Sequence, residues 1–341
     1  MTVQRSPKRA TISDVARMAG VSIATVSRVL NGTAPVAEET VQQVNLAIAT
    51  LDYAPHAAAR TLAGRRTDTI GLLLPEISGA FYSPLIRGIE SGAREAGFDL
   101  LIHTSAEEHR ENGRIQMPLD EHNTDGLLVF TNRLTEAELA RFHGRGFPLV
   151  LLYRSAPASL DIPVVTLENK AGARSLVEHL IVDHGCRRIA FLAGPAGNED
   201  SYWREAGYLE ALRQHGIPDD PALHGVGAFD DVHGQAATEQ LLRQGVSFDA
   251  VFAGDDEAAM GCILALNQAG KRVPEDVAVV GFDDVLFARL MTPRLTTVRA
   301  PIEIAGQQAA RMLVALIQGD AVERLVLLPT ELVIRQSCGC A

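Results

Sequence analysis

TISDVARMAGVSIATVSRVLNG, residues 11–32, is the stretch that decides the fold of the first part of this chain. It predicts two short helices joined by a tight turn. Thr11 is expected to cap the first helix, with Asp14 as its capping-box partner. Gly20 stands where the chain needs a left-handed residue to leave that helix, and Ser22 then caps the second helix. The pattern is typical of a helix-turn-helix.

The second helix of this pair has two different faces. Val26, Val29 and Leu30 share an apolar face, and polar residues share the opposite one at helical spacing. Arg, Asn and Ser on a short exposed helix suit the DNA major groove, where Arg forks onto guanine and Asn onto adenine. The alternative is a capped helical hairpin in any small domain. The residues expected to contact DNA here are Thr11, Ser22, Ile23, Ala24, Thr25, Ser27, Arg28 and Asn31.

A third amphipathic helix, at residues 38–51, is expected to close a three-helix head. Residues 11–31 fit the motif T-I-x-D-V-A-x-x-A-G-V-S-x-x-T-V-S-R-V-L-N, and residues 53–62 fit Y-x-P-x-x-x-A-R-x-L. By these motifs the chain resembles the LacI/GalR family of bacterial transcription regulators over its whole length. The resemblance implies a homodimer that binds double-stranded operator DNA and responds to a small-molecule effector.

The segment after the head resembles the hinge of that family. It adds His56, Ala59, Arg60 and Leu62 to the expected DNA contacts. Residues 57–63 favour a helix but are too short to be stable alone in water, so we expect them to fold on the operator. Leu62 would then be an apolar wedge in the minor groove, although it could instead pack the linker against the rest of the chain.

We expect three segments: a head at residues 1–55, a hinge helix and linker at 56–67, and an effector-binding and dimerisation domain at 68–341. In the last, one subdomain takes about 68–167 plus 299–328. The other takes about 168–298 plus 329–341.

The charge distribution supports this division. The chain has 31 basic and 42 acidic residues, a net charge of −11. Residues 1–66 hold eight basic and four acidic residues, a net of +4, and the remainder has a net of −15. A basic head on an acidic body favours one orientation on DNA.

From residue 68 onward, short apolar runs alternate with amphipathic stretches, which predicts a parallel α/β fold. Strands are expected at 69–74, 99–103, 126–131, 149–153, 189–193, 250–253 and 277–282. Helices are expected at 83–96, 135–145, 169–184, 203–214, 257–269 and 302–318, the last returning to the first half. The predicted fold is a small all-α helix-turn-helix head followed by two doubly wound α/β subdomains, as in periplasmic sugar-binding proteins. A ligand cleft is expected at the carboxyl ends of the strands.

Polar and aromatic residues near these strand ends form the predicted effector site: Phe81, Tyr82, Arg154, Asn198, Asp200, Trp203, Arg204, Phe229, Asp255 and Asp283. Aromatic rings can stack on a sugar face, unless Phe81 and Tyr82 are plain core residues. Arg204 is expected to open a helix, and it matches a ligand-binding arginine of the family. Asp255 replaces a frequent Asn of the family and would offer acceptors only. A sugar is the favoured effector, and a nucleobase or nucleoside is the alternative.

Enzymatic function is not expected. The sequence lacks G-x-x-x-x-G-K-(S/T), G-x-S-x-G and H-E-x-x-H. Asp255–Asp256 and Asp283–Asp284 are adjacent in sequence, so each pair is interpreted as one pocket acid and one structural acid. We expect no cofactor. Repression is favoured, but the sequence leaves inducer or co-repressor, and dimer or tetramer, open.

Localisation and metal binding are judged from what the sequence lacks. No apolar run is long enough for a membrane span, and the N-terminus has no signal-peptide core, so a cytoplasmic protein is expected. Cys338-Gly339-Cys340 has one residue fewer between its sulfurs than the usual C-x2-C zinc pair, and no histidine cluster accompanies it. Two buried thiols and two thiols near the end of the sequence, without metal, are therefore expected.

Overall fold

The computed structural model describes residues 10–31, 34–53, 66–104, 110–111, 114–115, 119–130 and 134–340. The chain divides into two compact units, Met1–Thr67 and Asp68–Ala341. Each unit has its own hydrophobic core.

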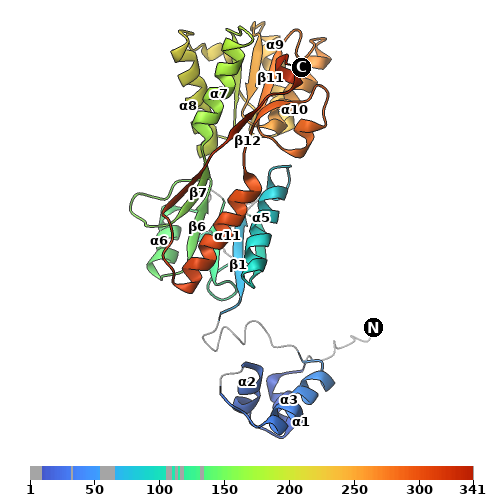
Figure 1. Ribbon diagram of the computed structural model, residues 1–341, viewed down its shortest axis with the longest axis vertical. Coiled ribbons are helices and arrows are strands. Elements are labelled where there is room, and N and C mark those ends of the chain that lie inside the picture. The colour runs from blue at the N-terminus through green and yellow to red at the C-terminus, as the bar shows by residue number, and fades with distance from the viewer. Residues whose placement is uncertain are drawn as a thin grey trace. The chain divides into compact units, whose positions relative to one another are not determined.

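The first unit is a three-helix head (Figure 1). Its helices are α1 (Ile12–Ala19), α2 (Ile23–Asn31) and α3 (Glu38–Thr50). One fully buried valine from each helix, Val15, Val26 and Val44, meets the others in a small core. The predicted helices are confirmed.

Local capping sets the angle between the first two helices. Thr11 and Asp14 form the expected reciprocal capping box, and Gly20 ends α1 at φ +68°. The backbone N–H of Thr25 donates to Ser22 Oγ (3.1 Å), which confirms the cap of α2. The capping residues that the sequence predicts therefore fix the turn between the two helices.

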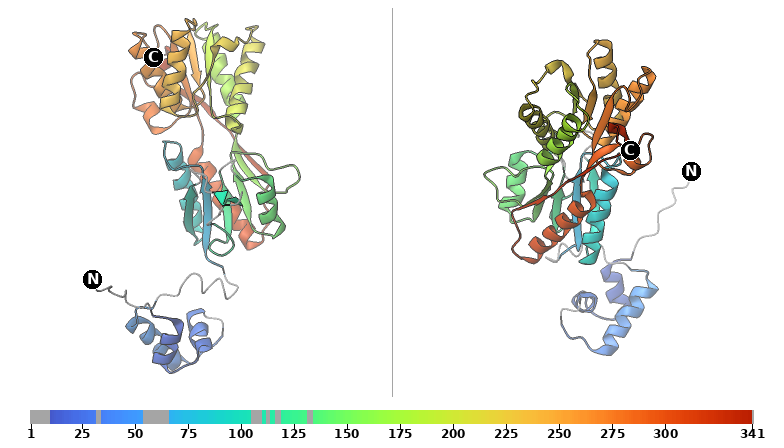
Figure 2. Two further views of the ribbon diagram at one scale, coloured as in Figure 1. Left: turned by 180° about the vertical axis from the view of Figure 1, so that it is seen from behind. Right: turned by 45° about the horizontal axis from the view of Figure 1, so that its top comes forward.

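The second unit contains two six-stranded sheets in separate lobes (Figures 1 and 2). The first lobe has the strand order β13-β7-β6-β5-β1-β2, with all pairs parallel. These strands are β13 (Leu325–Leu328), β7 (Val164–Leu167), β6 (Leu149–Leu152), β5 (Gly126–Val129), β1 (Thr69–Leu74) and β2 (Asp99–Thr104). The lobe also has α5 (Tyr82–Glu95), α6 (Glu136–Gly144), α11 (Ile302–Gln318) and a small hairpin of β3 (Arg110–Glu111) and β4 (Arg114–Ile115).

The second lobe repeats this strand order as β14-β12-β11-β10-β8-β9, with β14 antiparallel. Its strands are β14 (Glu331–Val333), β12 (Thr296–Arg299), β11 (Ala278–Asp283), β10 (Ala250–Ala253), β8 (Ile189–Ala193) and β9 (His224–Val226). Its helices are α7 (Asn169–Val182), α8 (Glu199–Gln214), α9 (Asp231–Arg243) and α10 (Asp256–Gln268), with short 3-10 turns η1 (Pro221–Leu223), η2 (Leu286–Arg289) and η3 (Gln336–Cys338). The predicted fold class is confirmed.

Three segments connect the lobes, and hydrogen bonds tie two of them together. The chain crosses after β7, after β12 and after β13. Glu168 N donates to the carbonyl of Leu328 (2.8 Å), and Thr330 Oγ1 donates to the carbonyl of Glu168 (3.0 Å). The connection between the lobes is thus a bonded bundle of extended chain, and α11 returns to the first lobe as predicted.

The structure differs from the predicted elements in two ways. It adds β3, β4, β7, β9, β12, β13, β14 and α9, which the sequence pattern does not predict. These strands are only two to four residues long, too short for a periodic signal. Helix α8 begins at Glu199, not at Trp203, because Asn198 caps it by accepting from Ser201 N (2.9 Å). Arg204 consequently lies in the second turn of α8, so its expected place at the start of a helix was wrong.

Gly88 tests how closely α5 and α11 approach. A methyl group at Gly88 would overlap the carbonyl of Glu303 in α11. We expect Gly88→Ala to lower the free energy of unfolding of the second unit by about 1–3 kcal/mol through overpacking. Gly144→Ala is the matched control, because a Cβ there meets no atom within 4 Å and a helical Gly favours replacement. Urea unfolding measures both variants, and equal loss in the two would contradict this close helix contact.

Candidate functional site

The head presents the exposed face of α2. Ile23, Ala24 and Arg28 are exposed, while Val26 behind them is fully buried. The hydroxyls of Ser22 and Thr25 lie 2.8 Å apart at the start of this helix. Because apolar positions hold the helix in the core, its outer side chains are free to meet a groove.

Of the other predicted DNA contacts, the structure describes the side chains of Thr11 and Ser27. Thr11 is exposed, and its hydroxyl donates to Asp14 Oδ2 (2.7 Å). Ser27 is half-buried and already has an interaction within the chain. The side chain of Asn31 and the hinge residues His56, Ala59, Arg60 and Leu62 lie outside the described residues.

The second unit has a cavity of about 570 Å³ where its two sheets face each other. Its walls come from the chain just beyond the carboxyl ends of strands in both sheets. Eight of the predicted effector residues line it: Phe81, Tyr82, Asn198, Asp200, Arg204, Phe229, Asp255 and Asp283. Strand order reverses beside β1 and β8, and such switch points in parallel sheets are where ligands bind.

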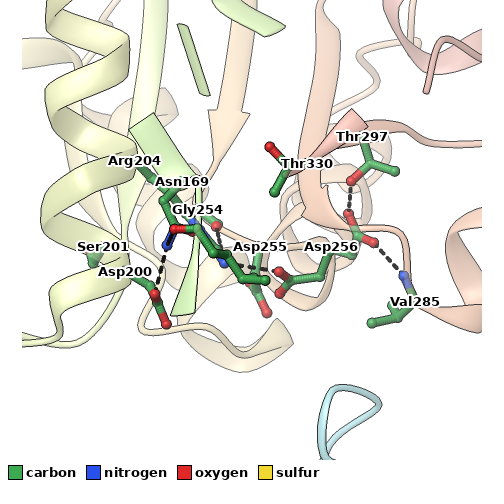
Figure 3. Close-up of polar contacts among 12 residues, drawn as sticks. Asn169, Asp200, Ser201, Arg204, Gly254, Asp255, Asp256, Val285, Thr297 and Thr330 are labelled. Carbon is green, nitrogen blue, oxygen red and sulfur yellow. Dashed lines mark hydrogen bonds and ion pairs between the residues drawn. The ribbon is translucent and has the colours of Figure 1, made fainter. Parts of the chain in front are cut away.

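The buried guanidinium of Arg204 organises one wall of the cavity (Figure 3). Its Nη2 donates to Asp283 Oδ1 (2.9 Å), its Nη1 to the carbonyl of Gly254 (2.7 Å) and its Nε to Asn169 Oδ1 (3.0 Å). Its carbon lies 3.9 Å from the centroid of the Phe282 ring. Arg204 is 2% exposed, so these partners replace water around the charge.

Two acids of the cavity wall have strongly raised pKa values. Burial raises the pKa of Asp255 to about 8, and the nearby Asp283 carboxylate adds to the shift. Burial likewise raises the pKa of Asp200 to about 7, against the attraction of Arg204. Asp255 also caps α10 by accepting from Ala258 N (2.8 Å). With so high a pKa the Asp255 carboxyl would be largely protonated near pH 7 and could also donate, which differs from the expectation that it offers acceptors only.

The second acid of each adjacent pair is structural, as predicted. Asp256 accepts from the hydroxyl of Thr297 (2.6 Å) and the backbone N–H of Val285 (2.9 Å). Asp284 accepts from Arg299 (2.8 Å) and Arg335 (2.5 Å). Neither residue lines the cavity.

Tyr153 is a cavity residue that the sequence analysis missed. Its ring belongs to a cluster with Phe81, Tyr82 and Phe130, with centroids 5.1–5.9 Å apart. Its side chain is buried, and no described residue forms a hydrogen bond with its hydroxyl. An unsatisfied buried hydroxyl in a cavity wall points to a ligand atom as its partner. A tyrosine directly after the apolar run at residues 149–152 was the available signal.

Two predicted effector residues do not line the cavity. Trp203 is 40% exposed, and its Nε1 donates to Glu199 Oε1 one helical turn away (3.4 Å). Arg154 follows Tyr153, whose left-handed backbone (φ +56°) turns the chain. In both cases the prediction named the residue next to one that does line the cavity: Trp203 beside Arg204, and Arg154 beside Tyr153.

Comparison with known proteins agrees with this architecture. Residues 11–56 match the family described as bacterial regulatory proteins, lacI family, and residues 177–338 match the periplasmic binding protein-like domain. The regulator CelR of Thermobifida fusca is 37% identical over 342 residues, which is 97% of this chain and 98% of CelR.

Two solved structures have the same fold. A CelR–cellobiose complex is 32% identical, with a TM-score of 0.71 over 96% of this chain and 100% of that chain. A lac repressor dimer bound to operator and the anti-inducer ONPF is 29% identical, with a TM-score of 0.81 over 97% and 99%. This chain is a regulator with a helix-turn-helix head and a periplasmic-binding-like body. It belongs to the LacI family of bacterial regulatory proteins.

None of the helices in the described part of the chain is both long and apolar enough to cross a membrane.

The raised pKa of Asp255 predicts that stability depends on pH. Because the carboxyl titrates near 8 in the folded protein and near 4 when unfolded, unfolding releases its proton between about pH 4 and 8. The free energy of unfolding therefore falls as pH rises through this window. Asp255→Asn keeps an N-cap acceptor and cannot ionise, so its melting temperature should fall less with pH than that of the wild type.

The matched control is Asp220→Asn, the same exchange at the half-exposed cap of η1. Thermal melts of the ligand-free protein across the same pH range compare the three proteins. Parallel pH profiles for wild type and Asp255→Asn would contradict a buried, neutral Asp255.

Proposed function

We propose that this chain is a transcription repressor that binds a near-palindromic operator as a homodimer and releases it when a small neutral sugar enters the cavity. The proposed parts are the head at residues 1–55, the hinge at 56–67 and the effector-binding body at 68–341. The observation that carries the proposal is the acidic, aromatic cavity with its unpartnered Tyr153 hydroxyl, on a chain that also has an exposed helix-turn-helix face.

The composition of the cavity wall favours an uncharged polyol. Seven carboxyl side chains line it: Glu76, Asp200, Asp230, Asp231, Asp255, Glu257 and Asp283. Arg204 is the one Lys or Arg among the described lining residues, and Asp283 already neutralises it. Even with Asp255 neutral and Asp283 paired with Arg204, the other lining carboxyls leave a negative charge that would repel phosphorylated sugars and nucleotides. Carboxyl groups that accept and donate fit vicinal hydroxyls, and the ring cluster fits the apolar face of a sugar.

A nucleobase or nucleoside remains the alternative occupant, because aromatic rings also stack on bases. The relative CelR was solved with cellobiose, which supports the sugar. A co-repressor would tighten operator binding and an inducer would weaken it, so operator affinity with and without ligand separates these two mechanisms.

Hydrogen bonds between the two lobes would transmit ligand binding to the hinge and the head. Ala80 N in the first lobe donates to Glu257 Oε1 in the second (2.6 Å). Ser155 donates from both its backbone and its hydroxyl to the carboxylate of Glu199 (2.6 and 2.5 Å). Because these bonds border the cavity, a sugar that changes the angle between the lobes must also rearrange them. In a dimer this change would move the two hinges apart, with Leu62 as the proposed minor-groove wedge.

Arg28 tests the proposed major-groove contact. If its guanidinium forks onto a guanine, Arg28→Ala should weaken operator binding by about 1–3 kcal/mol and relax preference at one base per half-site. Arg28→Lys keeps the charge but not the fork, so the salt dependence should stay while discrimination falls. Fluorescence anisotropy with single-base operator variants measures both effects. Full discrimination in Arg28→Ala would remove this assignment.

Tyr153 tests the cavity without disturbing the buried network. Since no described residue forms a hydrogen bond with its hydroxyl, Tyr153→Phe should keep the melting temperature but weaken binding of the effector about tenfold, the loss expected for one hydrogen bond. Tyr208→Phe is the matched control, because the Tyr208 hydroxyl donates to the carbonyl of Ile189 (2.9 Å) and neither residue lines the cavity. That variant should lose stability and keep ligand affinity.

A thermal-shift panel of neutral sugars, sugar phosphates and nucleosides identifies the ligand for this comparison. Stabilisation by a nucleoside alone would contradict the sugar assignment. Unchanged sugar affinity in Tyr153→Phe would remove this residue from the site.

A further inference from the structure

Four metal-binding side chains converge in the second lobe, away from the sugar cavity. They are His179 in α7, His184 just after it, Cys338 in η3 and Cys340 two residues on. Their ring nitrogens and sulfurs all lie within 4.8 Å of one another. The expectation that no histidine cluster accompanies the Cys-Gly-Cys sequence was therefore wrong. Pairing of β14 with β12 brings residues 336–340 back toward α7, which sequence distance conceals.

The separations of the donor atoms fit a tetrahedral ion. His179 Nε2 lies 3.2 Å from His184 Nε2 and 3.4 Å from Cys338 Sγ, and Cys340 Sγ lies 3.4 Å from His184 Nε2 and 3.9 Å from His179 Nε2. Zinc bonds of about 2.0 Å to nitrogen and 2.3 Å to sulfur at tetrahedral angles separate such donors by about 3.3–3.8 Å. All four of these separations lie close to this range.

The surroundings orient these donors. His179 Nδ1 lies 2.6 Å from Asp183 Oδ2, so its N–H donates there and Nε2 turns its lone pair toward the cluster. A carboxylate behind a ligand histidine is the usual support of a zinc site. The hydroxyl of Thr296 donates to Cys338 Sγ (3.1 Å), an arrangement that stabilises a thiolate.

The single residue between the cysteines is suited to its position. Gly339 has φ +105°, and a Cβ there would approach His184 Nδ1 to 3.4 Å. The left-handed turn lets both thiols face the same two histidines, which an ordinary side chain at this position would oppose. The two cysteines can therefore face the same histidines, although a spacing of one residue is unusual for a pair of metal ligands.

We propose that His179, His184, Cys338 and Cys340 bind a Zn²⁺-type ion through two imidazole nitrogens and two thiolate sulfurs. Four protein ligands complete a tetrahedron and leave no open position, which defines a structural rather than a catalytic site. The ion would fasten residues 338–340 to the end of α7. The hydroxyl of Ser337 donates to the carbonyl of Val279 and accepts from the backbone N–H of Thr296. These bonds already hold residues next to the cluster on the sheet, and the ion would add to them.

Zinc content of the reduced, full-length protein tests the proposal. After dialysis against a weak chelator, elemental analysis should find a single zinc ion per chain. His184→Ala and Cys340→Ala each change a half-buried ligand and should lose the zinc while keeping the circular dichroism of the wild type. Cys262→Ala and His215→Ala, which change the same residue types outside the cluster, should retain it. Retention in the ligand variants, or absence of zinc from the wild type, would overturn the proposal.

Cobalt gives an independent readout of geometry. Co²⁺ added to the metal-free wild type should give intense tetrahedral d–d bands and a thiolate charge-transfer band, both absent in Cys340→Ala. A weak octahedral spectrum would contradict a site of two thiolates and two imidazoles. A Cys338–Cys340 disulfide that persists in the presence of a reducing agent would contradict it as well. Strong chelators should also lower the melting temperature of the wild type and leave that of His184→Ala unchanged.

Discussion

The buried charge of Arg204 is the constraint on which the effector-binding body depends. Taking a guanidinium out of water costs several kcal/mol unless its donors are satisfied. Here Asp283, Gly254 and Asn169 satisfy them from three separate segments of the second lobe. Each partner must lie at a strand end or helix start for this to happen, so the charge fixes their relative positions. Arg204 and Asp283 of this network line the cavity, and Gly254 and Asn169 hold the arginine from behind.

This arrangement divides the work of the cavity between its lobes. The second lobe supplies an acidic wall whose arginine is already paired, and the first supplies aromatic rings and a hydroxyl with no partner among the described residues. A ligand that forms hydrogen bonds with both walls favours the closed arrangement of the lobes, because only that arrangement lets it contact both walls at once. Three connecting segments and the hydrogen bonds of Glu257 and Glu199 join the two lobes, an arrangement that favours a hinge motion. The proposed repressor function therefore rests on the difference in ligand binding between the two arrangements of the lobes.

The sequence predicts the head well and the cavity in part. Caps at Thr11, Gly20 and Ser22 are local signals, and the structure confirms them. Strand-end positions such as Asp255 and Asp283 follow from the α/β pattern, but their raised pKa values depend on burial that no local pattern encodes. The His179–Cys340 cluster was missed because it depends on contacts between segments far apart in the chain. Tyr153 did have a local signal, its place directly after an apolar run, but the burial of its hydroxyl is not encoded there.

In the proposed mechanism, sugar and operator act on one two-state element, the arrangement of the two lobes, and the reciprocity of their binding tests this most directly. The affinity of the full-length protein for its effector sugar should be measured by calorimetry with and without saturating operator. If the sugar weakens operator binding by a given factor, about 5- to 150-fold for typical coupling, operator must weaken sugar binding by the same factor. Equal sugar affinity in the two titrations, despite release of operator by the sugar, would contradict the account.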